Sequence, residues 1–274
     1  TPVYNDWESL NKLLFNLNKS INYLETKVRV VVINDFSTEK INIKIKKFKN
    51  IQNLKVLNLR KNVGSQKGIY IALKYIKKFK YKSTIAILDS DGEDNPFKLK
   101  KLINLSLKKK NYIFVANRSK RTENFFLKSL NQLRLIITFF LTGKYINFGN
   151  FSSFSSQNLK NILSNDNLWL AYPSGILKNC NKIKSININK NKRYYGKSKV
   201  NLIFLLNHSI KIMSVFRKEI FIRSLIMILF LTIFIETRFN DLSVILFFLF
   251  LNIFFNIFYH INSLRFNALN LIKN

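Results

Sequence analysis

The sequence predicts an α/β domain with a mostly parallel sheet, followed by a C-terminal hairpin of two transmembrane helices. Residues 1–116 alternate short apolar runs of strand length with helical patterns, which is typical of strands joined by helices. Polar residues recur where these runs end. Near the C-terminus, two long apolar runs are joined by a short polar loop. The first pattern predicts the sheet, the second a ligand site at its edge, and the third the hairpin.

The first half of the chain supplies the strands and the helices that cover them. An N-terminal amphipathic helix is expected from apolar residues that step by three and four, namely Trp7, Leu10, Leu14, Leu17, Ile21 and Leu24. Apolar runs rich in β-branched residues predict strands over residues 28–34, 54–59, 84–89 and 112–117. Asn62 is expected to cap a helix that runs through Ile69, Ala72, Leu73 and Ile76. Short apolar strands separated by helices favour a parallel sheet covered on both faces.

After residue 120 the sequence becomes more apolar. Residues 124–144 and 200–218 each predict a helix in which basic residues interrupt an apolar run. Either helix can lie in a membrane interface or pack as an ordinary core helix. We assign residues 1–199 to the α/β domain, with an interfacial helix at 124–144, and residues 200–218 to a juxtamembrane amphipathic helix.

Residues 219–262 predict the transmembrane hairpin, and residues 263–274 a cytoplasmic tail. The run over 242–259 has the length of a membrane span, whereas the run over 224–235 is short unless upstream residues extend it. The alternative is a hairpin buried in a protein core.

Basic residues flank the predicted hairpin on both sides, at Lys211, Arg217, Lys218, Arg223, Arg265 and Lys273. The connecting loop carries only Arg238, which Glu236 and Asp241 offset. Because cytoplasmic flanks carry the excess of Lys and Arg, both flanks and the N-terminal domain are expected in the cytoplasm. The protein is therefore expected to be a multi-pass membrane protein with two helices.

The charge balance points to an anionic partner. The chain has 46 Lys and Arg residues against 14 Asp and Glu residues, a formal net charge of +32. Such a charge suits nucleic acid, anionic lipid or a phosphorylated substrate. Part of the excess reflects a composition in which Lys, Asn, Ile and Phe are all frequent, as an AT-rich coding sequence produces. The single cysteine, Cys180, excludes an internal disulfide and a multi-cysteine zinc site, and the two histidines exclude a His-rich metal site.

The scarce acidic residues concentrate in "LDSDGEDNPF", residues 88–97. This segment is either a solvated turn or a metal site. It follows the third predicted strand, while Asp35 and Arg118 follow the second and the fourth. Since ligands of parallel sheets bind at the carboxyl ends of the strands, these positions predict one site. Carboxylates two residues apart, as in Asp89 and Asp91, can reach a single hard cation such as Mg²⁺ or Mn²⁺.

Seven motifs occur in an order that matches a known family. They are "TPVYND", "VVINDFSTEK", "NVGSQKGIYIAL", "LDSDGEDNPF", "VANRSKR", "INFGNFSSFS" and "RYYGKSKVNL". Over residues 1–218 the chain resembles glycosyltransferase family 2, in particular the polyprenyl-phosphate branch typified by dolichol-phosphate mannosyltransferase. The resemblance implies a GT-A type nucleotide-diphospho-sugar transferase domain with a Rossmann-like sheet. Family members usually begin with a strand before the first motif, so the first strand is expected to be missing.

The resemblance also implies roles for the matching residues. Those implied for nucleotide-sugar binding are Pro2, Tyr4, Asp6, Asp35, Asp89, Arg118, Arg193 and Lys199, with a helix or turn cap as the alternative role of Asp35. Those implied as catalytic are Asp91, Asp94 and Arg118. The implied metal ligands are Asp89, Asp91 and Glu93, for an Mg²⁺ or Mn²⁺ ion that neutralises the leaving diphosphate. Those implied for the lipid phosphate are Arg121, Arg193, Ser198 and Lys199.

One stretch departs from the family branch. "INFGNFSSFS" has Asn147, Asn150 and Ser152 where the branch usually carries aspartates and an arginine. An asparagine cannot act as a general base. A phosphate acceptor is already ionised and needs no base, whereas a hydroxyl acceptor needs Asp94 or another acid to serve.

The sequence therefore predicts a membrane-bound inverting glycosyltransferase that moves a sugar from a UDP- or GDP-sugar to a polyprenyl phosphate, undecaprenyl or dolichyl. One alternative is transfer to a hydroxyl of a glycan or lipid. Another is a catalytically silent family-2 fold kept as a membrane scaffold. Nucleic acid is not expected as a partner, because no recognition motif accompanies the charge. Association into a homo-oligomer stays open.

Overall fold

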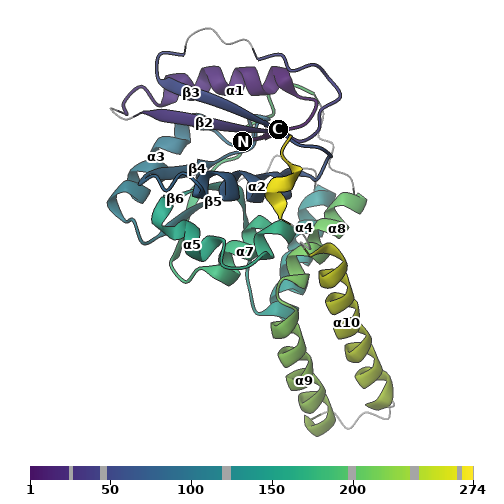
Figure 1. Cartoon of the computed structure of the whole chain (residues 1–274). Coiled ribbons are helices and arrows are strands. Elements are labelled where there is room, and N and C mark those ends of the chain that lie inside the picture. Colours follow the sequence, from purple (N-terminus) through teal and green to yellow (C-terminus); the bar gives the residue numbers. More distant parts are fainter. Residues whose placement is uncertain are drawn as a thin grey trace.

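The computed structural model describes residues 1–24, 27–43, 48–118, 125–196, 202–234, 241–263 and 267–273. These residues form an α/β domain from which two long helices project (Figure 1). The N-terminus and the last described residues both lie on the α/β domain, away from the tip of the projecting pair (Figure 1).

The strands of the described residues lie in two sheets. The first has the order β1-β2-β3, from Pro2–Val3, Val28–Asn34 and Ile51–Asn58, and both of its pairings are parallel. The second has the order β4-β6-β5-β7, from Thr84–Ile87, Phe148–Ser155, Ile113–Arg118 and Ile183–Ile188. In this sheet β6 runs antiparallel to β4 and β5, while β5 and β7 are parallel. The expected mostly parallel arrangement is confirmed, with β6 as the reversed strand.

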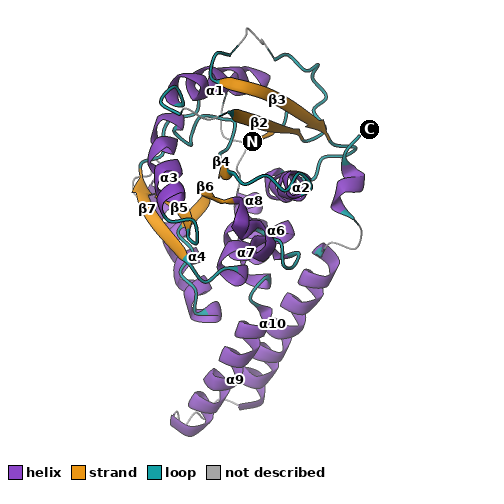
Figure 2. Cartoon of the chain, turned by 60° about the vertical axis from the view of Figure 1, so that its left-hand side comes forward, coloured by secondary structure: helices purple, strands orange, loops and turns teal. Residues whose placement is uncertain are grey.

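Helices cover both faces of the sheets (Figure 2). One face packs against α1 (Trp7–Ser20) and α3 (Pro96–Lys108). The other packs against α2, α5, α6 and α7, which span Ser65–Lys77, Leu159–Ile162, Asn167–Leu170 and Tyr172–Asn179. A 3₁₀ turn, η1 (Ser156–Asn158), precedes α5.

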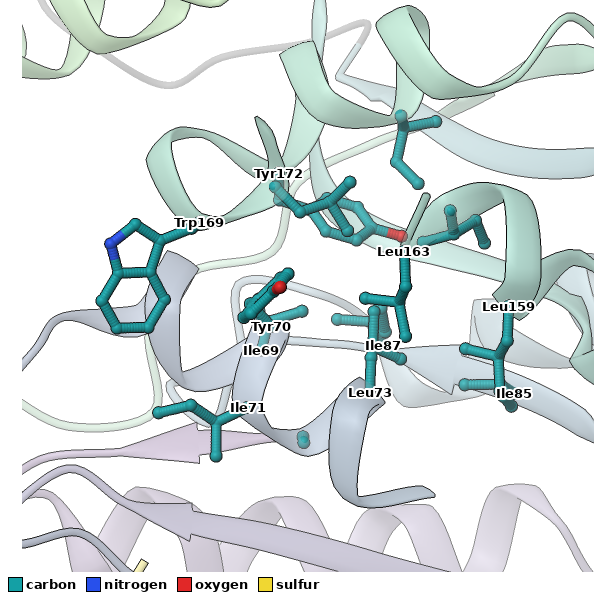
Figure 3. Close-up of a cluster of buried hydrophobic side chains, with 14 of the residues drawn as sticks. Ile69, Tyr70, Ile71, Leu73, Ile85, Ile87, Leu159, Leu163, Trp169 and Tyr172 are labelled. Atoms are coloured by element: carbon teal, nitrogen blue, oxygen red, sulfur yellow. The ribbon is translucent and has the colours of Figure 1, made fainter. Parts of the chain in front are cut away.

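Two hydrophobic cores result, one on each face. Because neighbouring residues of a strand point to opposite faces, Val32 of β2 packs with α1 and α3, whereas Ile33 packs with α2. Figure 3 shows part of the second core, where the rings of Tyr70 and Trp169 meet edge to face with centroids 5.8 Å apart. The hydroxyl of Tyr70 also donates to Asp166. These contacts fix α2 and α6 beside the strand ends that carry the polar residues.

Local structure differs from expectation at one place in the α/β domain. Asn62 does not cap α2, because that helix begins at Ser65 after Gly64, and the Asn62 side chain donates to the carbonyl oxygen of Asp35 at 3.2 Å. Pro2–Val3 forms the short strand β1 and pairs with β2, and a missing strand before this motif stays a prediction.

The C-terminal helices form a hairpin. α9 (Arg217–Phe234) and α10 (Asp241–Asn262) pack side by side (Figure 1). Among the residues that the structure describes, only Leu242–Asn262 forms a helix that is long and apolar enough to cross a membrane. Length and composition therefore show one candidate span, where the sequence predicted two.

Two further apolar helices, α4 (Phe125–Thr142) and α8 (Leu202–Ser214), lie at the base of the hairpin. Each buries some residues against its neighbours, such as Leu135 and Ile212. Each also exposes large apolar side chains, which are Leu133, Ile136, Ile137, Phe139, Phe140, Leu202, Ile203, Phe204 and Leu206. Neither is an ordinary core helix.

The segment after the hairpin returns to the α/β domain. Within the 3₁₀ turn η2 (Ala268–Leu271), Ala268 and Leu271 are buried in the same core as α2. The edge of β3 holds this segment through an antiparallel bridge between Leu59 and Ile272 and two backbone hydrogen bonds of 2.7 and 2.8 Å. Residues 267–273, which were expected to belong to a cytoplasmic tail, thus pack as part of the domain.

Candidate active site

The carboxyl ends of three strands meet at one edge of the α/β domain. β1 leads into Asp6, β2 ends before Asp35, and β4 leads into the acidic turn of residues 88–95. The N–H of Asp35 donates to the carbonyl oxygen of Val3 at 2.9 Å, which joins the first two strand ends. Arg193, described below, joins the first to the third.

Asp35 anchors the turn that precedes α2. Its side chain is buried, and its two carboxylate oxygens accept hydrogen bonds from the N–H groups of Val63 and Gly64 at 2.7 and 2.8 Å. Burial raises the pKa of Asp35, although the two amides act in the opposite direction. The turn-capping role that the sequence left open is the one that the structure shows, and a contact between Asp35 and a nucleotide base stays a prediction.

The acidic turn is shaped by its own side chains. The N–H of Glu93 donates to Oδ1 of Asp91 at 3.0 Å, and the N–H of Asp89 donates to Oδ2 of Asp94 at 3.0 Å. Asn95 caps α3 by accepting from the N–H of Phe97 at 2.9 Å, as a residue before a helix N-terminus often does. The segment is therefore a folded turn with a defined helix start.

The segment after β7 lies against the acidic turn and contributes two cations. Arg193 Nη1 lies 3.0 Å from Oδ2 of Asp91, and its Nη2 lies 3.2 Å from Oδ2 of Asp6. Lys190 Nζ lies 2.6 Å from Oε2 of Glu93. One guanidinium thus holds the ends of β1 and β4 together, as planar arginine donors favour. Lys190 is a residue that the sequence analysis missed, since in a chain with 46 basic residues nothing singled it out.

Tyr194 packs against the acidic turn from the same side. Gly92 has a φ of +87°, and a Cβ added to it would lie 2.5 Å from the Tyr194 ring. The hydroxyl of Tyr194 accepts from Asn16 of α1 at 3.0 Å. A glycine is therefore required at this position for two reasons, its backbone conformation and the close approach of the ring.

The carboxyl group of Asp91 has a perturbed pKa. Burial, together with the neighbouring carboxylates of Asp89 and Glu93, raises this pKa to about 6, although Arg193 and the N–H of Glu93 act in the opposite direction. Three carboxylates this close disfavour one another's charge, and a hard cation with oxygen ligands would relieve that repulsion. The donor set therefore fits Mg²⁺ or Mn²⁺ in kind.

The three predicted metal ligands do not yet surround one point. Asp89 Oδ1 accepts from Asn150, while Asp91 and Glu93 are paired with Arg193 and Lys190. Across the described ranges, no three His, Cys, Asp or Glu side chains converge as a metal-binding group. Loading a cation would require at least one of the two ion pairs to open.

Asn150 of β6 positions Asp89. Its Nδ2 donates to Oδ1 of Asp89 at 3.0 Å, and its Oδ1 accepts from Nε2 of Gln66 at 2.8 Å. Gln66 in turn accepts from the N–H of Tyr172 at 2.7 Å. The register of β4 and β6 pairs Ile87 with Ser152, which brings Asn150 beside Asp89 two residues further along. The departure from the family pattern at Asn150 thus has a structural role here.

Comparison with known families decides the class. Residues 1–164 match the family model described as Glycosyl transferase family 2. The chain belongs to glycosyl transferase family 2. It is therefore a member of a family of glycosyltransferases whose donors are nucleotide-sugars.

Among solved structures, this glycosyltransferase is similar to the crystal structure of S. aureus TarS 1-349. The identity is 17%, the TM-score is 0.47, and the match covers 89% of this chain and 66% of the TarS chain. The glycosyltransferase thus spans slightly less than two thirds of the TarS chain that it matches. No curated protein sequence matches it.

The remaining predicted site residues either lie at the same edge of the α/β domain or are not described by the structure. Pro2 is buried in β1, and Tyr4 is exposed where that strand ends. Arg118 is the last residue of β5, but its side chain is not described. Arg121, Ser198 and Lys199 lie outside the described residues, so their implied roles stay predictions.

Proposed function

We propose that this family-2 glycosyltransferase transfers a sugar, with inversion, from a nucleotide-diphospho-sugar to a polyprenyl phosphate at a membrane surface. The observation that carries the proposal is the carboxylate of Asp91, held between other carboxylates and the guanidinium of Arg193 where the strand ends meet. Donors of parallel α/β sheets bind at such an edge. A nucleotide diphosphate there needs a cation and fixed positive charge, and this edge can supply both.

On the donor side, Asp91 with Asp89 and Glu93 would hold Mg²⁺ or Mn²⁺, and a bound ion neutralises charge that develops on the leaving diphosphate. Arg193, which is paired with Asp91 at 3.0 Å, would offer its guanidinium to a phosphate of the donor. The acceptor oxygen attacks the anomeric carbon, the bond from that carbon to the diphosphate breaks, and the nucleoside diphosphate leaves with the electron pair.

The state of Asp94 favours a phosphate acceptor over a hydroxyl acceptor. A hydroxyl needs a base to take its proton, and Asp94 is the acid that the sequence offered for that role. Asp94 is 4% exposed, and its Oδ2 already accepts the N–H of Asp89. Asn150 cannot replace it. A phosphate is ionised at neutral pH and reacts without such a base.

The helices support a membrane location. α4 and α8 present exposed apolar side chains at the base of the hairpin, and Leu242–Asn262 is a candidate span. The segment after α10 packs on β3, on the same side as the start of α9. If α10 crosses the membrane, α9 must cross it as well, because the start of α9 and the segment after α10 lie on the same side. Its 18 residues extend about 27 Å at 1.5 Å per residue, close to the ~30 Å hydrocarbon thickness.

The distribution of basic residues supports a cytoplasmic catalytic domain under this proposal. Lys211, Arg217, Lys218 and Arg223 precede or begin the hairpin on the domain side, and cytoplasmic flanks are rich in Lys and Arg. Polyprenyl phosphate would then meet the cytoplasmic nucleotide-sugar at the level of α4 and α8.

The test is a transfer assay with the full chain in detergent or nanodiscs. The protein would receive Mg²⁺ or Mn²⁺, radiolabelled UDP- or GDP-sugars, and undecaprenyl or dolichyl phosphate. We expect lipid-soluble label that Asp91→Ala abolishes and that the matched control Glu8→Gln, on the exposed side of α1, preserves. Label found only on a glycan or lipid hydroxyl would mean that the acceptor is a hydroxyl compound and not a polyprenyl phosphate. Absence of both turnover and metal-dependent nucleotide binding would mean that the protein is a catalytically silent scaffold.

A further inference from the structure

The segment after the hairpin reaches the rim of the proposed donor site. Lys273 Nζ lies 5.3 Å from the centroid of the Phe36 ring. Phe36 follows Asp35 directly, is 43% exposed, and has a φ of +61°. Bulky residues seldom adopt this backbone conformation, and such residues cluster at ligand sites. An exposed aromatic ring with a cation against it therefore stands at the carboxyl end of β2.

Backbone and amide contacts hold Lys273 in this place. Its N–H donates to the carbonyl oxygen of Asn58, at the end of β3, at 2.7 Å. The Asn58 side chain accepts from Nδ2 of Asn34 at 2.9 Å, and Oδ1 of Asn34 accepts from the N–H of Ser37 at 3.0 Å. One network thus joins Lys273 to the ends of β3 and β2 and to the loop that contains Phe36.

The ammonium group of Lys273 can bind a ligand at this rim only through acceptor atoms. It carries three N–H donors and no acceptor. The ring of Phe36 can pack against a flat base, as exposed aromatic side chains do. Uracil and guanine carry carbonyl oxygens on their edges, whereas adenine has no carbonyl and offers only ring nitrogens as acceptors beside its amino group.

We propose that Lys273 binds the base of the donor nucleotide, donating a hydrogen bond to a carbonyl oxygen of uracil or guanine beside the ring of Phe36. Residues 267–273 then form one wall of the donor pocket, although they follow the hairpin in sequence. This inference rests on the proposed nucleotide-sugar donor, and it names a residue and a class of base that the proposal leaves open.

The experiment measures nucleotide affinity in the full-length, detergent-solubilised protein. UDP, GDP and ADP would be titrated calorimetrically with Mn²⁺ into the wild type, Lys273→Ala, Lys273→Arg and the control Lys160→Ala on the exposed surface of α5. We expect Lys273→Ala to raise the Kd of the tighter of UDP and GDP roughly three- to tenfold. The Kd for ADP should rise less than that of the tighter of UDP and GDP, and Lys273→Arg should retain most of the affinity.

A purely structural role would look different. The backbone bond to Asn58 survives in Lys273→Ala, so its melting temperature should equal that of the wild type. An unchanged Kd for UDP and GDP, or an equal loss for all three nucleotides, would overturn the assignment of Lys273 while leaving the proposed function intact. A wild-type protein that binds neither UDP nor GDP would overturn both.

Discussion

Asp91 shows how a binding site costs stability. A carboxyl whose pKa is raised on folding binds its proton more tightly in the folded chain, so stability is lost as pH rises from the unfolded value near 4 through about 6. At neutral pH the charged Asp91 therefore destabilises the metal-free protein. In the proposed function this charge would bind a cation, so the cost in stability would serve ligand binding.

Replacing Asp91 by asparagine should expose this cost. At about pH 7.5 with EDTA, we expect Asp91→Asn to melt higher than the wild type, by an amount equivalent to about 1–3 kcal/mol, because the variant keeps the shape and loses the charge. At about pH 4.5, where the wild-type carboxyl is protonated, the two should melt alike. A variant that melts lower at both pH values would show that the ion pair with Arg193 outweighs the repulsion.

Gly92 and Gly196 form a natural pair for a second prediction. Both have positive φ, +87° and +67°, but an added Cβ meets the Tyr194 ring at Gly92 and nothing within 4 Å at Gly196. Gly196→Ala should cost about 1 kcal/mol, from backbone strain alone. Gly92→Ala should cost clearly more and weaken nucleotide binding, because Tyr194 and with it Arg193 must move. Equal melting temperatures for the two variants would show that the Tyr194 ring can move away from the added Cβ without a cost in stability.

At the scale of residues, the sequence predicted which side chains lie at the strand ends better than it predicted their hydrogen-bond partners. The acidic turn, Asp35 and Arg193 could be predicted from residue type and motif order. The chain of hydrogen bonds from Asp89 through Asn150 to Gln66 could not, because it depends on the register between β4 and β6. The same holds for Asp35, whose carboxylate is occupied by the backbone of a turn 28 residues further along.

Among the strands, the sequence did not predict β6 and β7. β6, with the sequence "FGNFSSFS", carries serines at positions that are buried, including Ser152 and Ser153. Small polar residues weaken the apolar signal of a strand, and a reversed central strand has no local signature. In contrast, the bounds of the four apolar strands of the first half were predicted within a few residues, because apolar runs in the sequence indicate buried strands.

The hairpin contains a polar contact that can be tested at the level of its two helices. Asn252 of α10 donates to Oγ of Ser224 in α9 at 3.1 Å, and both side chains are buried. Such bonds between membrane helices contribute about 1 kcal/mol. Asn252→Ala should lower the melting temperature, whereas Asn256→Ala, which loses only a bond to its own helix, should not. Equal effects would mean that apolar packing alone joins α9 to α10.

The molecule as a whole constrains its own topology, because residues on both sides of the hairpin pack on one domain. Single cysteines placed in a Cys180→Ala background can test this with a membrane-impermeant maleimide on sealed vesicles. Lys12→Cys on α1 and Asn270→Cys in η2 should be labelled from the same side, and Leu242→Cys at the start of α10 only from the other. Labelling of all three from one side would mean that the hairpin lies on the membrane without crossing it.

The bridge between Leu59 and Ile272 also sets an order of events during synthesis. β3 leaves the ribosome well before the segment that pairs with its edge, and α9 and α10 are synthesised between them. Contacts this distant in sequence form late and slowly. The edge of β3 therefore stays incomplete until both helices have been synthesised, so that folding of the α/β domain is completed only after α9 and α10 have been made.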